Sequence, residues 1–257
     1  MVQFNKQTFR ETRQKLWGEE TFDLPLDYFP SLPSTNQKLW QLLNEGKPLP
    51  RVVIAGQQTA GKGQWGRQWQ SSWGGLYLSL ALSTQLPATN SHQLTLCSGW
   101  GIAQALRSKA VRVNLKWPND LLLNQKKLGG ILSETRIQNG HITQAVIGVG
   151  INWQNSVPET GINLQPRSQI TSLESLAAVV AHGIIWGYQQ YLAIGIEKIL
   201  PSYLQMLSSK GRKVLVDGFP GTVVGVTAQG DLKIRLNSLG AGVEVLRSPG
   251  TISLSYR

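Results

Sequence analysis

The chain has 257 residues, enough for one large domain or for a medium domain joined to a small one. Its single cysteine, Cys97, excludes an intrachain disulfide, so packing must hold the fold together, and a reducing cytoplasm is the expected location. The chain shows no signal-peptide pattern and no apolar run of about eighteen residues, so we expect neither export nor membrane association.

The formal net charge of +11 is concentrated in one stretch of the chain. Residues 51–136 contain ten Lys and Arg against Asp120 and Glu134, so +8 of the +11 lies there. Such a surface would attract a polyphosphate substrate or an acidic protein. A basic nucleic-acid-binding module is the alternative, but no aromatic and basic RNA motif is visible, and the roughly thirty residues before Ser34 are too few for a helix-turn-helix domain. We therefore expect no DNA partner.

The first two hundred or so residues predict one α+β domain. Residues 1–30 read as an N-terminal extension with a short helix from Phe9 to Trp17, and Ser34 or Thr35 is a good N-cap for a second helix. Periodicity and breakers then predict strands at 52–55, 76–82, 113–117, 121–123, 130–134 and 145–151, and helices at 93–108, 172–192 and 195–208. We expect a mixed β-sheet with packed helices over residues 31–209.

The sequence pattern changes near Gly211. Short β runs separated by turn signals follow, at 213–217, 221–227, 232–236, 243–247 and 252–256. This pattern is typical of a small barrel, so residues 210–257 are predicted to form a second, C-terminal domain.

A glycine-rich loop joins the first two of the predicted sheet strands. Its glycines allow backbone N–H groups to surround an anion, and Lys62 and Arg67 add positive charge. The loop is not a Walker A loop, because no Ser or Thr follows the Gly-Lys pair, and it is not a dinucleotide fingerprint, because a strand rather than a helix follows. Taken alone, it could equally be a structural connection.

A second motif follows about fifty residues later. Lys116 ends a predicted strand, Pro118 forces an extended bend, and Asn119 and Asp120 lie at the turn, with Lys127 just beyond. Each lysine alone would be a solvated surface residue by default, and Asp120 a turn cap. Together with the glycine-rich loop, they predict a site for carboxylate activation with a nucleotide.

Four motifs in this order resemble those of the biotin–protein ligases, also called biotin–acetyl-CoA-carboxylase ligases, over roughly residues 32–257. They are Ser34-Thr35-Asn36; Gln58 with the Gly61–Arg67 loop and Trp69; Lys116-Trp117-Pro118-Asn119-Asp120 with Lys127-Leu128-Gly129-Gly130; and Gly148-Val149-Gly150-Ile151-Asn152. The resemblance implies a class II synthetase-like catalytic domain with a seven-stranded mixed sheet and a C-terminal SH3-like β-barrel. It also implies the monofunctional type, which has no N-terminal DNA-binding domain.

The implied reaction uses biotin and ATP with Mg²⁺ as substrates, forms biotinyl-5'-AMP, and then modifies a lysine of a biotin carboxyl carrier protein of acetyl-CoA carboxylase. No resident metal and no permanently bound cofactor are expected, and the protein would be a monomer or homodimer. By resemblance, biotin would be held by Ser34, Thr35, Asn36, Gln58, Lys62, Gly63, Gln64 and Lys127, and the adenylate by Gly61, Gly66, Trp69, Asn119 and Asn152. Lys127, Lys116 and Arg67 would be the cations of catalysis.

The transfer step needs a proton acceptor, because the acceptor lysine is almost wholly protonated at neutral pH and only its neutral amine is nucleophilic. Our hypothesis assigns this role to Asp120. A lipoate or octanoate ligase is the nearest rival function, because it shares the catalytic fold; the Lys-Trp-Pro-Asn-Asp and Lys-Leu-Gly-Gly runs favour biotin. Lys62 and Gln64 replace two arginines common in the family, which predicts weaker retention of the adenylate.

Overall fold

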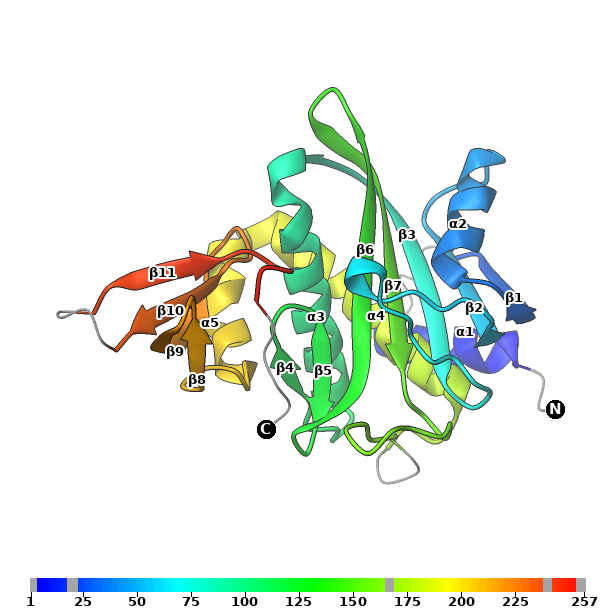
Figure 1. Cartoon of the computed structure of the whole chain (residues 1–257). Coiled ribbons are helices and arrows are strands. Elements are labelled where there is room, and N and C mark those ends of the chain that lie inside the picture. Colours follow the sequence, from blue (N-terminus) through cyan, green and yellow to red (C-terminus); the bar gives the residue numbers. More distant parts are fainter. Residues whose placement is uncertain (1–3, 18–22, 165–168, 238–241, 253–257) are drawn as a thin grey trace.

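The computed structural model describes residues 4–17, 23–164, 169–237 and 242–252. A seven-stranded sheet crosses the larger part of the molecule in the order β1-β2-β3-β7-β6-β5-β4 (Figure 1). Strand β1 runs parallel to β2, and every other neighbouring pair in this sheet is antiparallel, which confirms the predicted mixed sheet. The strands are β1 (Leu26–Leu32), β2 (Arg51–Gln58), β3 (Leu76–Pro87), β4 (Asn114–Lys116), β5 (Asp120–Leu123), β6 (Lys126–Gln138) and β7 (His141–Ile151).

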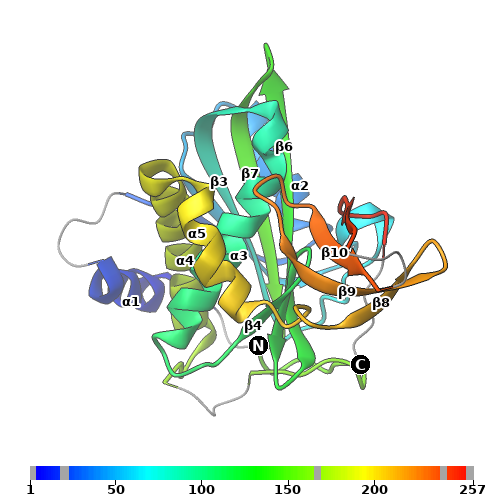
Figure 2. The same ribbon diagram turned by 90° about the vertical axis from the view of Figure 1, so that its left-hand side faces the viewer.

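Five α-helices in the described residues cover the two faces of this sheet. They are α1 (Lys6–Trp17), α2 (Thr35–Asn44), α3 (Ser91–Arg107), α4 (Leu173–Ile194) and α5 (Ile196–Met206). Figure 2 shows the sheet nearly edge-on, with α1, α3, α4 and α5 gathered on one side and α2 on the other. No helix in the part of the chain that the structure describes combines the length and apolarity needed to cross a membrane.

Side chains along each strand point alternately to the two faces of the sheet, where they form two separate cores. On β2, Val52 and Ile54 join the large core under α3 and α4, whereas Val53 and Ala55 join a smaller core under α2. Successive strand residues point to opposite faces, so one apolar run can supply both cores. The smaller core does not fill the whole face of the sheet under α2. Polar side chains occupy the remainder, among them the buried Ser79 of β3.

A separate four-stranded antiparallel sheet follows α5, in the order β11-β10-β9-β8. Its strands are β8 (Lys213–Val216), β9 (Phe219–Val226), β10 (Leu232–Leu236) and β11 (Glu244–Arg247). The indole N–H of Trp117 donates a 2.8 Å hydrogen bond to the carbonyl of Gly230, which ties this sheet to the Lys-Trp-Pro-Asn-Asp segment. The fifth predicted strand, 252–256, lies mostly outside the described residues.

Two features of the large sheet differ from the sequence expectations. Strand β1 was not predicted; Pro25 precedes it and Pro30 lies within it, and it forms the edge of the sheet, where proline is tolerated. Strands β6 and β7 are longer than predicted and form a hairpin closed by Asn139 and Gly140, both with positive φ. Ser34 does occupy the N-cap of α2, but its side chain makes no capping hydrogen bond.

Glycines bring α3 and α4 into close contact. A Cβ added at Gly101 of α3 would lie 2.1 Å from the carbonyl oxygen of Gly183 on α4. One added at Gly187 would lie 2.4 Å from the carbonyl oxygen of Cys97. Backbone therefore packs on backbone at this crossing, and no side chain can move aside to accept a methyl group.

We expect Gly101→Ala to lower the free energy of unfolding by about 1–3 kcal/mol, as overpacking does. Gly99→Ala is the matched control two residues away on the same helix, because its Cβ would meet only the ends of the flexible side chains of Ile131, at 3.4 Å, and Leu115, at 3.7 Å. Gly99→Ala should raise stability by up to about 1 kcal/mol through helix propensity. Urea unfolding of both variants measures the difference; equal midpoints would contradict close helix packing.

Candidate active site

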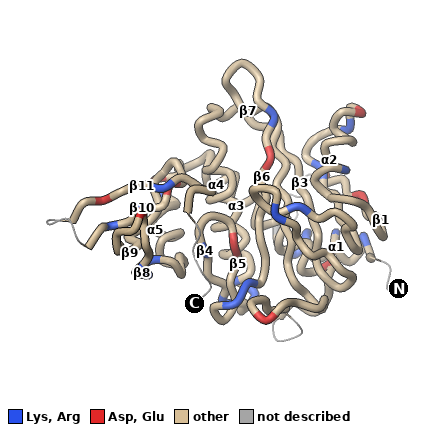
Figure 3. The backbone as a smooth tube through the Cα atoms, viewed as in Figure 1, with Lys and Arg blue, Asp and Glu red and all other residues tan. Residues whose placement is uncertain are grey.

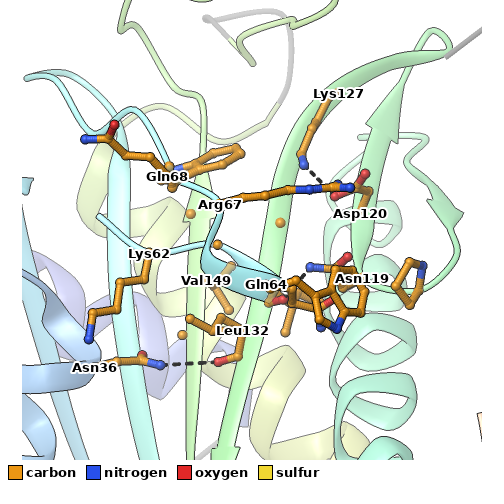
Figure 4. Close-up of a pocket in the computed structure, with 18 of the residues that line it drawn as sticks. Asn36, Lys62, Gln64, Arg67, Gln68, Asn119, Asp120, Lys127, Leu132 and Val149 are labelled. Carbon is orange, nitrogen blue, oxygen red and sulfur yellow. Dashed lines mark hydrogen bonds and ion pairs between the residues drawn. The ribbon is translucent and has the colours of Figure 1, made fainter. Parts of the chain in front are cut away.

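The predicted motifs converge on one cavity of about 330 Å³ (Figure 4). It lies where α2, the loop between β2 and β3, and strands β4 to β7 meet. Its lining comprises residues 34–36, Gln58, 62–65, 67–69, 116–120, Lys127, 130–132, 148–150 and 250–252. Of the predicted site residues, all but Gly61, Gly66 and Asn152 line it.

One end of the cavity is lined mainly by neutral hydrogen-bonding groups, and Lys62 lies on the same side of the cavity (Figure 4). The backbone N–H and the hydroxyl of Thr35 both donate to Gln58 Oε1, at 2.8 and 3.1 Å. The amide nitrogen of Gln58 donates onward to the hydroxyl of Ser71 at 2.8 Å. The Ser79 hydroxyl lies 2.6 Å from Asn36 Oδ1 and 2.7 Å from Thr35 Oγ1. This end can therefore recognise a neutral group rich in hydrogen-bonding atoms.

The other end is charged. Lys116 ends β4 and Asp120 begins β5, and the two residues face each other in the antiparallel register of these strands. Lys127 at the start of β6 places its Nζ 2.6 Å from Asp120 Oδ1 and 5.2 Å from the ring centre of Trp69. Figure 4 shows the Arg67 side chain pointing toward Asp120. Three cations thus surround one carboxylate, which leaves a net positive end.

Burial changes the acid–base behaviour of Lys116. Its pKa is lowered to about 8, mainly by desolvation; Asp120 raises the pKa, and the positive charges of Lys127, Arg212 and Arg67 lower it. Arg212, from the segment before β8, was not predicted to act here. An anion entering this end would favour the charged form of Lys116.

The glycine-rich loop folds back on itself. The N–H of Gly63 donates to the carbonyl of Arg67 at 2.7 Å, and the N–H of Trp69 donates to the carbonyl of Gly61 at 2.9 Å. A Cβ at Gly61 would lie 2.5 Å from the Trp69 carbonyl oxygen. Gly66 has a φ of +72°, which favours glycine. These two glycines serve the turns of the loop and do not line the cavity.

Asn152 lies just outside the cavity and connects two segments behind it. Its side-chain nitrogen lies 3.4 Å from the carbonyl of Lys127 and 3.3 Å from that of Ile162. Its backbone N–H donates to the carbonyl of Leu128 at 2.9 Å. The position of Asn152 therefore supports the strand that carries Lys127, and its predicted contact with an adenylate stays a prediction.

Two glycines of β7 leave space for side chains of the site. A Cβ at Gly148 would lie 2.3 Å from Asn36 Oδ1, and one at Gly150 would lie 2.4 Å from Trp69 Nε1. The Gly148–Asn152 run was singled out from sequence, but its contacts with Asn36 and Trp69 were not expected. Because these two residues lack side chains, the β7 backbone itself forms the floor of the cavity.

The segment after the C-terminal sheet also contributes a wall that was not predicted from the sequence. Residues 250–252, which follow β11, line the cavity. A Cβ at Gly250 would lie 2.5 Å from the indole nitrogen of Trp65, so this segment lies directly against the tip of the glycine-rich loop. No local pattern could have indicated this, because the two residues lie in connecting segments that are far apart in sequence.

Comparison with known proteins gives a consistent result. The model of the biotin/lipoate A/B protein ligase family matches residues 28–152. The bifunctional ligase/repressor BirA of Bacillus subtilis is 30% identical over 226 residues, which are 82% of this chain and 70% of that protein. The biotin–[acetyl-CoA-carboxylase] ligase of Paracoccus denitrificans is 34% identical over 112 residues, 42% of this chain and 46% of that protein.

Among solved structures, the biotin protein ligase of Aquifex aeolicus in complex with biotin and ATP superposes with a TM-score of 0.66 at 24% identity, covering 87% of this chain and 98% of that one. This likeness shows a shared fold. The sequence relatives and the family model, taken with the four motifs gathered at one cavity, identify the chain as a ligase of the biotin–protein ligase family.

Proposed function

We propose that this protein joins biotin to a lysine of a biotin carboxyl carrier protein through a biotinyl-5'-AMP intermediate. The observation that carries the proposal is one cavity with an end of mainly neutral hydrogen-bonding groups and an end where Lys116, Lys127 and Arg67 gather. Biotin has a neutral ureido ring at one end and a carboxylate at the other, so its two ends match the two ends of this cavity. The biotin and ATP held by the Aquifex aeolicus relative support the same pair of substrates.

In the first step, a carboxylate oxygen of biotin attacks the α-phosphorus of ATP, and pyrophosphate leaves with the bonding electron pair. No protein nucleophile is needed, so catalysis depends on positioning and on cations that stabilise the developing charge. Lys127 is proposed to lie between the biotin carboxylate and the α-phosphate. Lys116 and Arg67 would contact the phosphates, because both line the same charged end.

We propose that Mg²⁺ enters as the MgATP complex. No group of three or more His, Cys, Asp and Glu side chains gathers within the described ranges. Of the residues that line the cavity, Asp120 is the one carboxylate, and Lys127 is ion-paired with it. A cation carried by the nucleotide phosphates suits such a site better than one held by the protein.

In the second step, the ε-amine of the acceptor lysine attacks the acyl carbon of the mixed anhydride, and AMP leaves with the electron pair of the broken C–O bond. Asp120 is proposed to accept the proton that the amine releases. The name of the Paracoccus denitrificans relative supports acetyl-CoA carboxylase as the source of the acceptor.

The test of the function is ATP–pyrophosphate exchange by the purified protein with biotin, lipoate or octanoate, followed by addition of a biotin carboxyl carrier domain. We expect exchange with biotin alone and then labelling of the carrier lysine. Lys127→Met should lower exchange by about 10²–10³-fold, as loss of a transition-state contact does. Lys126→Met is the matched control, because Lys126 is the exposed neighbour, and its exchange should be unchanged. Exchange with lipoate instead of biotin would contradict the proposal.

Asp120→Asn separates the two half-reactions. We expect transfer from preformed biotinyl-5'-AMP to the carrier to slow by about 10²-fold, the scale of general base catalysis, while adenylate formation falls much less. Single-turnover rates of each step measure the difference, with the exposed Asp217→Asn as control. Equal losses in both steps would show that Asp120 acts only by holding Lys127.

ATP affinity should depend on pH through Lys116. Because its pKa is about 8, its charge is lost as pH rises through 8, and the affinity for a nonhydrolysable ATP analogue should fall about three- to tenfold between pH 7 and 9. Lys116→Arg stays charged and should bind equally well throughout this range. Calorimetric titration measures both; a pH-independent affinity of the wild type would count against a phosphate contact.

The same pKa shift makes the folded protein more stable as pH rises, although ATP affinity falls. Between pH 8 and about 10.4 the unfolded chain holds a proton on this lysine that the folded protein has lost. The contribution of Lys116 to the free energy of unfolding therefore increases with pH over this range. Below pH 8 the lysine is charged in both states and this gain is absent.

A further inference from the structure

A carboxylate lies directly behind the hydrogen-bonding end of the cavity, where Asn36 is. Asn36, which is 3% exposed, donates from its side-chain nitrogen to Glu134 Oε2 at 3.1 Å. The same nitrogen lies 3.4 Å from the carbonyl oxygen of Leu132, a contact that Figure 4 shows. Glu134 belongs to β6 and is not among the residues that line the cavity. It can reach a bound ligand only through Asn36.

These contacts allow one orientation of the Asn36 amide. Both partners of its nitrogen are acceptors without a proton to give, so a flipped amide would place Oδ1 against a carboxylate and a carbonyl oxygen. In the observed orientation Oδ1 accepts from the hydroxyl of Ser79 at 2.6 Å. An amide oxygen has two lone pairs, which leaves one for a donor in the cavity.

Of the two contacts, Glu134 is the stronger constraint. Its bond is shorter, and hydrogen bonds to a charged acceptor are roughly twice as strong as neutral ones. The 3.4 Å contact with Leu132 is beyond the usual range for an N–H donor. Without Glu134, the direction of the Asn36 amide would depend on this weak contact and on the Ser79 hydroxyl, which can donate or accept.

Glu134 is itself held in place by α2. The indole N–H of Trp40 donates to the same Oε2 atom at 2.9 Å. The guanidinium carbon of Arg136, two residues along β6, lies 5.0 Å from the Trp40 ring centre. Arg136 also donates to Asn44 Oδ1 at the end of α2 at 2.6 Å. The carboxylate thus has one fixed position between the helix and the strand.

We propose that Glu134 is a positioning residue for ligand recognition. It fixes the Asn36 amide so that Oδ1 accepts from a ureido N–H of biotin, and its negative charge, acting through the amide, strengthens that acceptor. This inference rests on the proposed function. It also assigns to Glu134 part of the discrimination against lipoate, because a dithiolane ring offers no N–H to Oδ1.

The test is direct calorimetric binding of biotin and of a nonhydrolysable ATP analogue, separately, to the wild type and its variants. Glu134→Leu keeps approximate volume but removes the acceptor, and we expect its Kd for biotin to rise at least tenfold while its Kd for the ATP analogue stays within twofold. Glu134→Gln keeps an acceptor oxygen and should lose at most threefold in biotin affinity. An unchanged biotin Kd in Glu134→Leu would overturn the inference.

Two further comparisons separate positioning from packing. Trp40→Phe removes the second donor to Glu134 but keeps the Asn36 bond, so the biotin Kd should rise less than in Glu134→Leu; a loss equal to that of Glu134→Leu would overturn the inference. In an Asn36→Ala background, Glu134→Leu should have no further effect on the biotin Kd, because its effect passes through the amide. An additional tenfold loss there would contradict this path.

Should Glu134→Leu fail to fold, the side-chain amide resonances of Asn36 decide the question in Glu134→Gln. Exchange of a charged acceptor for a neutral one should move them upfield, and unmoved resonances would overturn the inference. Failure of the proposed function is distinct, because the wild type itself would then bind no biotin.

Discussion

The cavity exists because β7 lacks two side chains. Gly148 and Gly150 lie on the face of the sheet that α2 covers, and any Cβ there would enter the space of Asn36 or Trp69. Two segments that are distant in sequence, the start of α2 and the end of the glycine-rich loop, can therefore approach the sheet backbone. Everything else at the site, including the contact of Lys127 with the Trp69 ring, depends on that approach.

Electrostatics divides the cavity in two. At one end, burial depresses the pKa of Lys116, and Asp120 partly offsets the cost of placing several cations together. At the other end, the Glu134 carboxylate lies behind Asn36 and accepts a hydrogen bond from its side-chain nitrogen. Figure 3 shows Lys and Arg spread over many elements of the fold, so net charge alone does not locate the site. The electrostatic properties of the site depend on which charged side chains are buried and which are paired.

The C-terminal sheet is part of the site as well as a neighbour of it. Residues 250–252 lie against Trp65, and Trp117 donates to Gly230, so the sheet touches both catalytic motifs. This arrangement couples the position of the glycine-rich loop to the docking of the sheet. Trp65 itself has a positive φ of 53° and is 52% exposed, and Gly250 lies against its indole ring.

Strand alternation, glycine-rich turns and four ordered motifs are local signals, and they were enough to predict the mixed sheet, its flanking helices, the small second sheet and most of the cavity residues. The remaining features depend on tertiary contacts. Strand β1 is defined by pairing at an edge, Gly61 and Asn152 support backbone rather than line the cavity, and Ser79, Glu134 and Gly250 enter the site through contacts with distant segments. Such roles depend on which residues meet after folding, and no pattern in neighbouring residues records them.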